Sequence, residues 1–502
     1  MYKIGKFPWY VPLLSIYPAS FYWGINATQI RFIYGLKFAV FSFAWGMLIW
    51  GITYLFVRNL EKSSIITFLI IFLFWSFGHI DNVIHSGHPT LQPLILASTW
   101  AGFFFLGVWW IKGRDAFSPQ IHNFLNLITA FLVVYSTVQI VPSVVKESRN
   151  NKSNQSQALF APTTGINEPE NSSRPDIYYI ILDAYTREDI FKEYLNYDNS
   201  EFISQLEDLG FFVARCSKSN YSHTHLSLSS SLNYRYLDEI FPIDPSARNY
   251  PVVIKNNAVR RILEGWGYKT VAFETGHLMT ELTDADVYYS RTFGFFKLTE
   301  FDLNYLETSL LKPLMKEPFY ITDLLMAAQY RARVLFVLDK LAETPKIVGP
   351  KFVFAHILAP HPPHVFGPNG EAKFVDYERY DDDKPKQREM YKQGYVNQSR
   401  YINKRILEIV KQIIDESTSP PIIVMQGDHG PSIGKEQVTS ILNAYYLPGE
   451  TRGLYDTISP VNSFRLVFDN YFGQDLQLEE DISRWSSVGR PLKFEVIPNN
   501  CQ

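Results

Sequence analysis

The sequence predicts an α-helical transmembrane bundle of about five helices, followed by an α/β domain with a mostly parallel central sheet and helices on both faces. Three observations support this fold class. Long uncharged runs fill the first 145 residues, a polar segment follows them, and short apolar strands then alternate with amphipathic helices. We therefore expect a transmembrane domain at residues 1–145, a flexible linker at 146–174 and an α/β domain at 175–502.

The composition narrows the function only slightly. The chain has 502 residues, enough for two or three domains, and its net charge of −3 gives no sign of nucleic-acid binding. Its two cysteines, Cys216 and Cys501, are too few for a disulfide framework. One bridge between them is possible, but we favour the interpretation of two unrelated thiols.

Four uncharged segments match the ~20 residues that a helix needs to cross ~30 Å of hydrocarbon. They lie at residues 38–57, 63–80, 89–111 and 120–145. A fifth, weaker segment at 7–30 contains three prolines, which spanning helices tolerate. A cleaved signal peptide would be single and shorter, so these segments predict an integral membrane protein.

The distribution of Lys and Arg predicts the orientation of the bundle. With the N-terminus inside, the outer segments carry only Arg31 and Lys37. The inner segments carry Lys3, Lys6, Arg58, Lys62, Lys112 and Arg114. An odd number of spans then puts everything after about residue 145 outside, and this placement reverses if the first segment does not span.

The chain changes character twice after the bundle. Residues 146–174 are polar and rich in Asn, Ser and Pro, which is typical of a flexible tether. From Pro175 onward, helical patterns occur at Glu201–Leu209 and at 388–416, and a further strand is expected at Asn443–Pro448. The main strand candidates are Ile177–Leu182, Thr270–Phe273, Phe352–Leu358 and Ile422–Met425.

Three of these strands lead into polar residues at their carboxyl ends. Asp183 follows the first, His361 comes shortly after the third, and Asp428–His429 follow the fourth. Ligands of open α/β sheets bind at this edge, so side chains far apart in sequence can meet there. Two carboxylates and an imidazole suit one divalent cation such as Mn²⁺ or Zn²⁺. An Asp after a strand is more often a helix cap, but three such ends together favour a site.

A segment dense in hydroxyls, Ser219–Tyr234, leads into an expected helix. A hydroxyl at a helix N-terminus lies in the positive end of the dipole, and a neighbouring metal would turn it into a nucleophile. A simple cap and turn explains the same composition.

The order of these motifs resembles the alkaline phosphatase/sulfatase superfamily. The strings that carry the resemblance are IILDAYTR, YSHTHLSLSSSLN, APHPPHVF and VMQGDHGPS. More narrowly, the chain is similar to the branch of lipoteichoic acid synthases and phosphoethanolamine transferases, whose members also carry about five N-terminal spans. The resemblance implies that residues 175–502 form a sulfatase-like catalytic domain.

The resemblance also implies roles for single residues. Asp183, which is often Glu in this branch, would bind the metal together with Asp428 and His429. Thr224 would be the nucleophile and contact the metal. We prefer it to Ser222 and Ser227 because phosphoethanolamine transferases have a similar Thr-x-x-Ser here. His361 would bind the phosphoryl oxygens or the leaving group.

Two departures from the superfamily pattern sharpen the expectation. Sulfatases need a Cys or Ser in a C/S-x-P/A-x-R string, which this chain lacks, since Cys216 is followed by SKSN. No histidine follows His429, which favours one metal over two. His356 could serve a second metal, although we interpret it as a strand residue near the first.

The resemblance thus implies transfer of phospholipid-derived phosphoglycerol or phosphoethanolamine to a cell-envelope glycan. The partners would be a phospholipid donor, a glycan acceptor and the lipids of a bacterial inner or cell membrane, with the catalytic domain on its periplasmic or extracellular side. The alternatives are a sulfatase or phosphatase of the same fold, or a catalytically silent, membrane-tethered protein that binds glycans or lipids.

Overall fold

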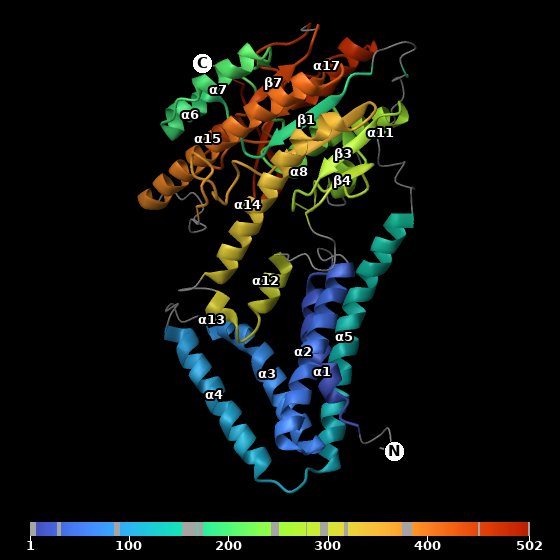
Figure 1. Cartoon of the computed structure of the whole chain (residues 1–502), viewed down its shortest axis with the longest axis vertical. Helices are drawn as coiled ribbons and strands as arrows, with labels where there is room; N and C mark the ends of the chain where they lie inside the picture. The colour runs from blue at the N-terminus through green and yellow to red at the C-terminus, as the bar shows by residue number, and fades with distance from the viewer. Residues whose placement is uncertain are drawn as a thin grey trace. The chain divides into compact units, whose positions relative to one another are not determined.

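The structure, a computed structural model, divides the chain into two compact units. One comprises residues 1–154 and 292–326, and the other residues 155–291 and 327–502. The described residues are 7–27, 32–84, 91–152, 168, 174–241, 250–277, 279–291, 300–315, 320–373, 384–449 and 452–499. Figure 1 shows a helical first unit and a second unit built around a sheet.

The first unit contains the predicted membrane bundle. Within the described ranges, four of its helices are long and apolar enough to cross a membrane, over Phe32–Val57, Leu60–Ile84, Ile95–Lys112 and Pro119–Pro142. Its helices are α1 (Tyr10–Ile25), α2 (Phe32–Val57), α3 (Leu60–Ile84), α4 (Leu91–Lys112), α5 (Pro119–Lys152), α12 (Glu300–Leu306) and α13 (Lys312–Met315). The helical bundle and the α/β fold that follows it confirm the predicted fold class.

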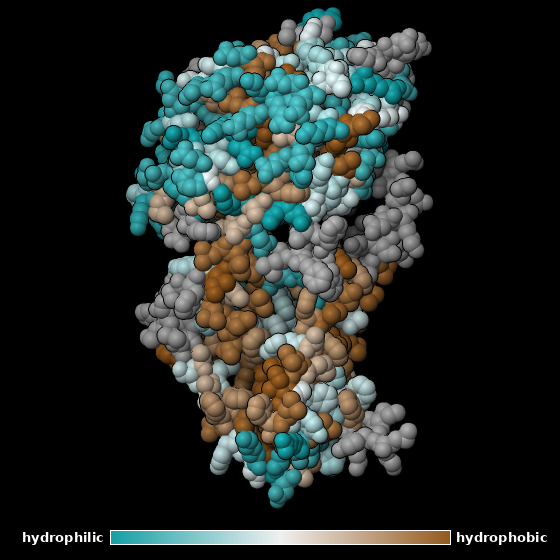
Figure 2. Space-filling model, viewed as in Figure 1, coloured by the Kyte–Doolittle hydropathy of each residue, from teal (hydrophilic) through white to brown (hydrophobic). Residues whose placement is uncertain are grey.

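The outward faces of these helices are apolar. Phe56 is 87% exposed, Trp109 74% and Leu127 71%. Figure 2 shows hydrophobic residues gathered over this unit. Side chains of this kind, exposed on consecutive long helices, are stable against lipid and unstable against water. The unit is therefore that of a membrane protein.

The weak first segment forms α1, which has only 16 residues. It runs parallel to α5. The Tyr10 N–H donates to Asn126 Oδ1 (2.7 Å) near the start of both helices, and a Cβ at Gly24 would lie 2.8 Å from Gln139 Oε1 near the end of α1. A helix of this length covers about 24 Å, most of the hydrocarbon thickness. Its pairing with α5 therefore supports counting α1 as a span.

Helix α5 is longer than its predicted span. It continues to Lys152 and so includes the first seven residues of the predicted linker, 146–152. The sequence between Pro142 and Lys152 contains neither Gly nor Pro, so each added residue gains a backbone hydrogen bond at little cost. The rest of the predicted linker, apart from residues 168 and 174, lies outside the described residues.

The second unit is built on a seven-stranded sheet of order β2-β7-β6-β1-β5-β3-β4. Strands β6, β1, β5, β3 and β4 run parallel to one another, and β7 is antiparallel to β6 and to β2. The strands are β1 (Ile177–Leu182), β2 (Phe212–Val213), β3 (Lys269–Phe273), β4 (Val287–Tyr289), β5 (Lys351–Ile357), β6 (Ile422–Gln426) and β7 (Asn443–Tyr446). The four main predicted strands are all present, with ends within one residue of the prediction.

Helices cover both faces of this sheet. Side chains of β1 alternate between two apolar clusters: Tyr178, Ile180 and Leu182 join one, and Ile177, Tyr179 and Ile181 join the other. A strand buried on both faces reads as a continuous apolar run, which is the pattern seen in the sequence. The first cluster is completed by α6 (Glu188–Leu195), α7 (Ser200–Asp208), α14 (Ile321–Ala342) and α15 (Pro385–Glu416). The second is completed by α8 (Thr224–Ser231), α11 (Ala258–Gly265) and α17 (Pro460–Phe472).

Short elements complete the unit. A two-stranded antiparallel ribbon of β8 (Ser483–Ser487) and β9 (Arg490–Ile497) lies apart from the main sheet. The remaining elements are α9 (Leu237–Ile240), α10 (Tyr250–Lys255), α16 (Lys435–Thr439) and the 3₁₀ helix η5 (Thr344–Lys346).

The register of the three central strands brings their carboxyl ends together. Leu182 of β1 pairs with Ile357 of β5, and Ile181 pairs with Gln426 of β6. All three strands therefore end at the same edge of the sheet, next to one another. The segments that follow them carry the polar residues picked out in the sequence.

Gly427 allows β6 to end against β1. A Cβ at this position would lie 2.2 Å from the Tyr185 main-chain oxygen. We expect Gly427→Ala to lower the stability of the full chain in detergent by about 2 kcal/mol, since backbone cannot move aside easily. Gly265→Ala is the matched control, because its Cβ would meet no described atom within 4 Å. Equal melting temperatures of the two variants would contradict the expectation.

Candidate functional site

Asp183 is the first residue after β1, and its side chain is buried. Its main chain ties two strand ends together, because its N–H donates to Ile357 O (2.9 Å) and its own carbonyl accepts from the His361 N–H (3.0 Å). The next residue, Ala184, has a φ of +63° and donates its N–H to Asp428 Oδ1 (3.1 Å). The backbone thus fixes the position of both carboxylates.

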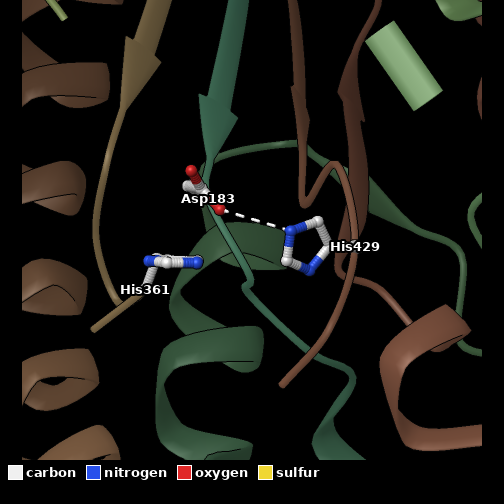
Figure 3. Close-up of side chains that lie close together, drawn as sticks. All are labelled: Asp183, His361 and His429. Atoms are coloured by element: carbon white, nitrogen blue, oxygen red, sulfur yellow. Dashed lines mark ion pairs between the residues drawn. The ribbon is translucent and has the colours of Figure 1, made fainter. Parts of the chain in front are cut away.

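His429 faces these two carboxylates. Its Nε2 lies 3.6 Å from Asp183 Oδ1 and 3.8 Å from Asp428 Oδ2, and Figure 3 shows the contact with Asp183. Its Nδ1 lies 2.8 Å from Gly430 O, a group that can only accept a hydrogen bond. The proton of the neutral ring therefore sits on Nδ1, and the lone pair of Nε2 points toward the carboxylates.

This arrangement fits a divalent cation. Asp183 Oδ1 and Asp428 Oδ2 are buried and have no hydrogen-bond partner among the described residues. Buried carboxylates without compensation are strongly unfavourable. Ligands at about 2.1 Å from a tetrahedral metal lie roughly 3.4 Å apart, close to the distances between these atoms and His429 Nε2. The three predicted ligands are therefore together, with an oxygen or nitrogen of each available.

His361 lies at the mouth of the same site. It is exposed, and one of its ring nitrogens lies within 4.8 Å of ligand atoms of Asp183 and His429. Its Nδ1 lies 2.6 Å from Pro362 O, and its main-chain oxygen accepts from Tyr330 Oη (2.8 Å) and Gln398 Nε2 (3.0 Å). The imidazole is thus held in place while its Nε2 stays available (Figure 3).

His356 contacts the other oxygen of Asp183 from within β5. Its Nε2 lies 3.3 Å from Asp183 Oδ2, and its Nδ1 lies 2.9 Å from Thr280 Oγ1. The side chain is fully buried, and the imidazole forms with Asp183 and Asp428 a group whose ligand atoms lie within 4.8 Å of one another, so His356 is a further candidate ligand. Its contact on Oδ2 leaves Asp183 Oδ1 directed toward His429.

Thr224 is the first residue of α8 and is half-buried. The imidazoles on both sides of it are half-buried, and this partial desolvation lowers the pKa of His223 and brings that of His225 to about 4. The charge of His429 lowers both pKa values further, so the start of α8 lies in the electrostatic field of His429. The role of Thr224 stays a prediction.

The two rival hydroxyls are less available. Ser222 Oγ donates to Ser486 O (3.3 Å) and accepts from the Ser486 N–H (3.1 Å), which engages it with the β8–β9 ribbon. Ser227 is 1% exposed. These observations favour Thr224 over both serines.

The second unit gathers its histidines around this site. They interact with one another or with Asp183 through ring contacts and charge. They are His223, His225, His277, His356, His361, His364 and His429. The sequence analysis missed His277, although it follows the predicted strand Thr270–Phe273 and the strand-end rule could have found it.

The imidazoles shape the electrostatics of Asp183. Burial alone would raise the pKa of this carboxyl group, but His361, His356 and His429 outweigh burial and hold the pKa well below its usual range. The site therefore favours an ionised carboxylate, the form that binds metal.

Comparison with known proteins gives the family. A family model described as Sulfatase matches residues 175–458, which is more than half of the chain. The chain belongs to the sulfatase family. It is thereby placed among metal-dependent hydrolases and transferases, as the sequence resemblance implied.

Several solved structures are similar to the chain at low identity. The C-terminal periplasmic domain of EcEptC from Escherichia coli has a TM-score of 0.41 and 13% identity, covering 66% of this chain and 92% of that one. The integral membrane lipooligosaccharide phosphoethanolamine transferase A from Neisseria meningitidis has a TM-score of 0.36 and 12% identity. The match covers 91% of this chain and 94% of that one. The lipoteichoic acid synthase LtaP from Listeria monocytogenes has a TM-score of 0.37 and 13% identity. The match covers 63% of this chain and 79% of that one. No curated protein sequence matches the chain.

The cysteines differ from expectation. Cys216 is disulfide-bonded, so the interpretation of two unrelated thiols is wrong for this residue. Cys501 lies outside the described residues. Sequence spacing alone carries no information on which distant thiols meet, because pairing depends on three-dimensional geometry.

His364 makes the stability of the second unit sensitive to pH. Burial, with a smaller contribution from the charge of His361, lowers the pKa of His364 to about 3. In the unfolded chain His364 has an ordinary pKa of about 6.5. Between about pH 6.5 and about pH 3 it therefore binds a proton in the unfolded chain but not in the folded one. Stability is therefore full above pH 6.5 and is lost as the pH falls toward 3, by about 1.4 kcal/mol per unit.

We expect the melting temperature of the wild-type chain in detergent to fall between pH 7 and pH 5. The melting temperature of the His364→Gln variant should fall less over the same interval, because glutamine does not titrate. Equal falls for both proteins would show that His364 is not responsible.

Proposed function

We propose that this chain is a membrane-anchored, metal-dependent transferase of phosphate-ester groups, with Thr224 as its nucleophile. The observation that carries the proposal is the pair of unpartnered carboxylate oxygens on Asp183 and Asp428, which face His429 Nε2 at the edge of the sheet. Residues 175–502 supply the catalytic domain, and residues 1–145 the membrane anchor.

One divalent cation, Mn²⁺ or Zn²⁺, is the proposed cofactor. Asp183 Oδ1, Asp428 Oδ2 and His429 Nε2 would hold it, and the Thr224 hydroxyl would complete the set. Such a cation, when bound, acts as a Lewis acid that lowers the pKa of a hydroxyl and neutralises charge on phosphoryl oxygens.

In the first step the Thr224 hydroxyl gives its proton to water, and its oxygen attacks the phosphorus of a phosphodiester. A bond forms from the threonine oxygen to phosphorus, the bond from phosphorus to the departing alcohol breaks, and a phosphothreonine ester remains. His361 Nε2, exposed at the mouth of the site, gives a proton to the departing alcohol. The N-terminus of α8 favours the added negative charge.

In the second step an acceptor hydroxyl attacks the same phosphorus. His361, which is neutral after the first step, takes the proton of this hydroxyl. The bond between phosphorus and Thr224 breaks, and the threonine oxygen takes a proton from water and recovers its hydroxyl. Water in place of the acceptor gives hydrolysis, so transfer requires that the acceptor be held at the site in preference to water.

The membrane helices suggest the substrates. A phospholipid donor lies in the bilayer that anchors the enzyme, and it would lose phosphoglycerol or phosphoethanolamine to a cell-envelope glycan. Parallel packing of α1 and α5 supports an odd number of spans. With the N-terminus inside, the catalytic domain then lies on the periplasmic or extracellular side of a bacterial inner or cell membrane.

Sulfate-ester hydrolysis is the second candidate, because the matching family model is Sulfatase. The chain lacks the string that is converted to formylglycine, and Cys216, the one candidate cysteine in that part of the chain, is disulfide-bonded. Faster turnover of an aryl sulfate than of an aryl phosphodiester would show that sulfate esters are the substrates and would overturn the proposal of phosphate esters.

Asp428→Asn should abolish metal binding while the fold is kept. The amide has nearly the same shape but no charge, so the cation loses a ligand. Metal content of the purified chain, measured by mass spectrometry, should fall to background. Asp339→Asn, at an exposed carboxylate paired with Arg405, is the control and should leave metal content unchanged. A wild-type chain that takes up no divalent cation on titration would favour the catalytically silent alternative.

Thr224→Ala should reduce turnover of an aryl phosphodiester by about 10³-fold or more, because the attacking oxygen is absent. Metal content should be largely retained, and Thr224→Ser should restore part of the activity. Mass spectrometry of the wild type quenched during turnover should find a phosphoryl ester on Thr224.

The same assay tests the orientation if it uses sealed, right-side-out vesicles and a membrane-impermeant substrate. Turnover without lysis is the expected result. Turnover that appears only after lysis would overturn the outward placement, and full activity of Thr224→Ala would overturn the nucleophile.

A further inference from the structure

A segment inside the family-matched region packs with the membrane helices. It comprises α12, α13 and the turn between them, Glu300–Met315, and we call it the docking segment. It lies within the sulfatase match at 175–458, yet it belongs to the compact unit of the membrane helices. The chain leaves the second unit after residue 291 and returns to it at residue 327.

The backbone of the docking segment is joined to α3. The Gly78 N–H donates to Thr308 O (3.1 Å), and the Leu310 N–H donates to Phe74 O (2.7 Å). Gly78 and Phe74 are four residues apart, so in a regular α-helix they would bond to each other. The segment therefore supplies hydrogen-bond partners for the two backbone groups, Gly78 N–H and Phe74 O, that would otherwise bond to each other within α3. A Cβ at Gly78 would lie 2.3 Å from Glu307 O, so only glycine permits this approach.

Two ion pairs of opposite sense fix the segment on the bundle. Lys37 of α2 pairs with Asp302 (2.5 Å), and Asp81 of α3 pairs with Lys312 (2.6 Å). The four side chains are between 4% and 16% exposed. A buried charge whose partner is removed is strongly unfavourable, and a like charge opposite it is worse. The two pairs thus favour a single position of the segment against α2 and α3, the one in which each charge faces an opposite charge.

Tyr305 fills the space among three membrane helices. Its ring stacks on Trp75 at 4.3 Å between centroids and lies 5.4 Å from Tyr22 and 5.5 Å from Phe38. Its hydroxyl contacts Ser42 Oγ (3.2 Å). Tyr305 is 6% exposed, so most of its large apolar surface is buried against α1, α2 and α3.

We propose that the docking segment is a second anchor, which holds the catalytic chain to the membrane bundle independently of the connection after α5. A unit held by one polar tether of about 20 residues explores tens of ångströms, whereas a docked second attachment restricts that range. The segment thereby restricts the active site to donors in the bilayer. This consequence for specificity rests on the function proposed above, and the anchoring itself does not.

Cleavage of the first connection tests the anchor directly. A specific protease site is placed between residues 155 and 165 of the full chain, and the protein in phospholipid vesicles is cut and washed in high salt. The C-terminal fragment should stay with the vesicles. Release of the C-terminal fragment of the cut wild-type chain from the vesicles would overturn the proposal.

Charge reversal tests whether the ion pairs hold the segment. Asp302→Lys with Lys312→Asp places like charges opposite Lys37 and Asp81, so the cut fragment should be released. Adding Lys37→Asp and Asp81→Lys restores opposite charges and should restore retention. Reversal of an exposed pair of the second unit, Lys435→Glu with Glu495→Lys, is the control and should not release it. Retention of the doubly reversed fragment, or no rescue in the fourfold variant, would contradict the role of the ion pairs.

Two substrates test the consequence for specificity. The doubly reversed chain, uncut, should lose about tenfold or more of its turnover of a phospholipid donor in vesicles, as the effective concentration of donor at the site falls. Turnover of a soluble aryl phosphodiester should be unchanged, which also shows that the catalytic unit is folded. Equal effects on both substrates, or none, would overturn the specificity role. A wild type inactive on both would count against the proposed function, while the cleavage experiment would still decide the anchor.

Discussion

Two buried carboxylates, Asp183 and Asp428, set the main constraint on the second unit. Each has an oxygen without a hydrogen-bond partner among the described residues, and together they place negative charge in a region of low dielectric. Positive charge must compensate for it, and the surrounding imidazoles and a divalent cation are the two available sources. The sheet register, the turn at Ala184 and the close approach at Gly427 all hold the carboxylates beside His429.

The gathering of histidines follows from the same constraint. Metal ligation needs the neutral imidazole, and burial keeps His223, His225 and His364 neutral by lowering their pKa values. His356 approaches Asp183 Oδ2 while Oδ1 stays free for a metal.

The sequence predicted the parts of the fold that depend on local pattern. Strand β1 is apolar throughout because both of its faces are buried, and the motifs after β1, β5 and β6 converge because parallel strands share their carboxyl edge. His277 follows β3 and was missed, since the rule was applied to three strand ends and not to the fourth. The disulfide of Cys216 depends on tertiary geometry, which spacing does not encode.

The docking segment could not be predicted from pattern for a related reason. Glu300–Met315 has no long apolar run, so hydropathy gives no reason to assign it to the membrane unit. Its assignment depends on single contacts, such as Asp302 with Lys37 and Tyr305 with Trp75. Lys37, one of the two outer positive charges in the orientation argument, is one of these residues. Its pairing leaves the predicted Lys and Arg bias unchanged, because the positive-inside rule counts Lys and Arg and is not a rule of net charge.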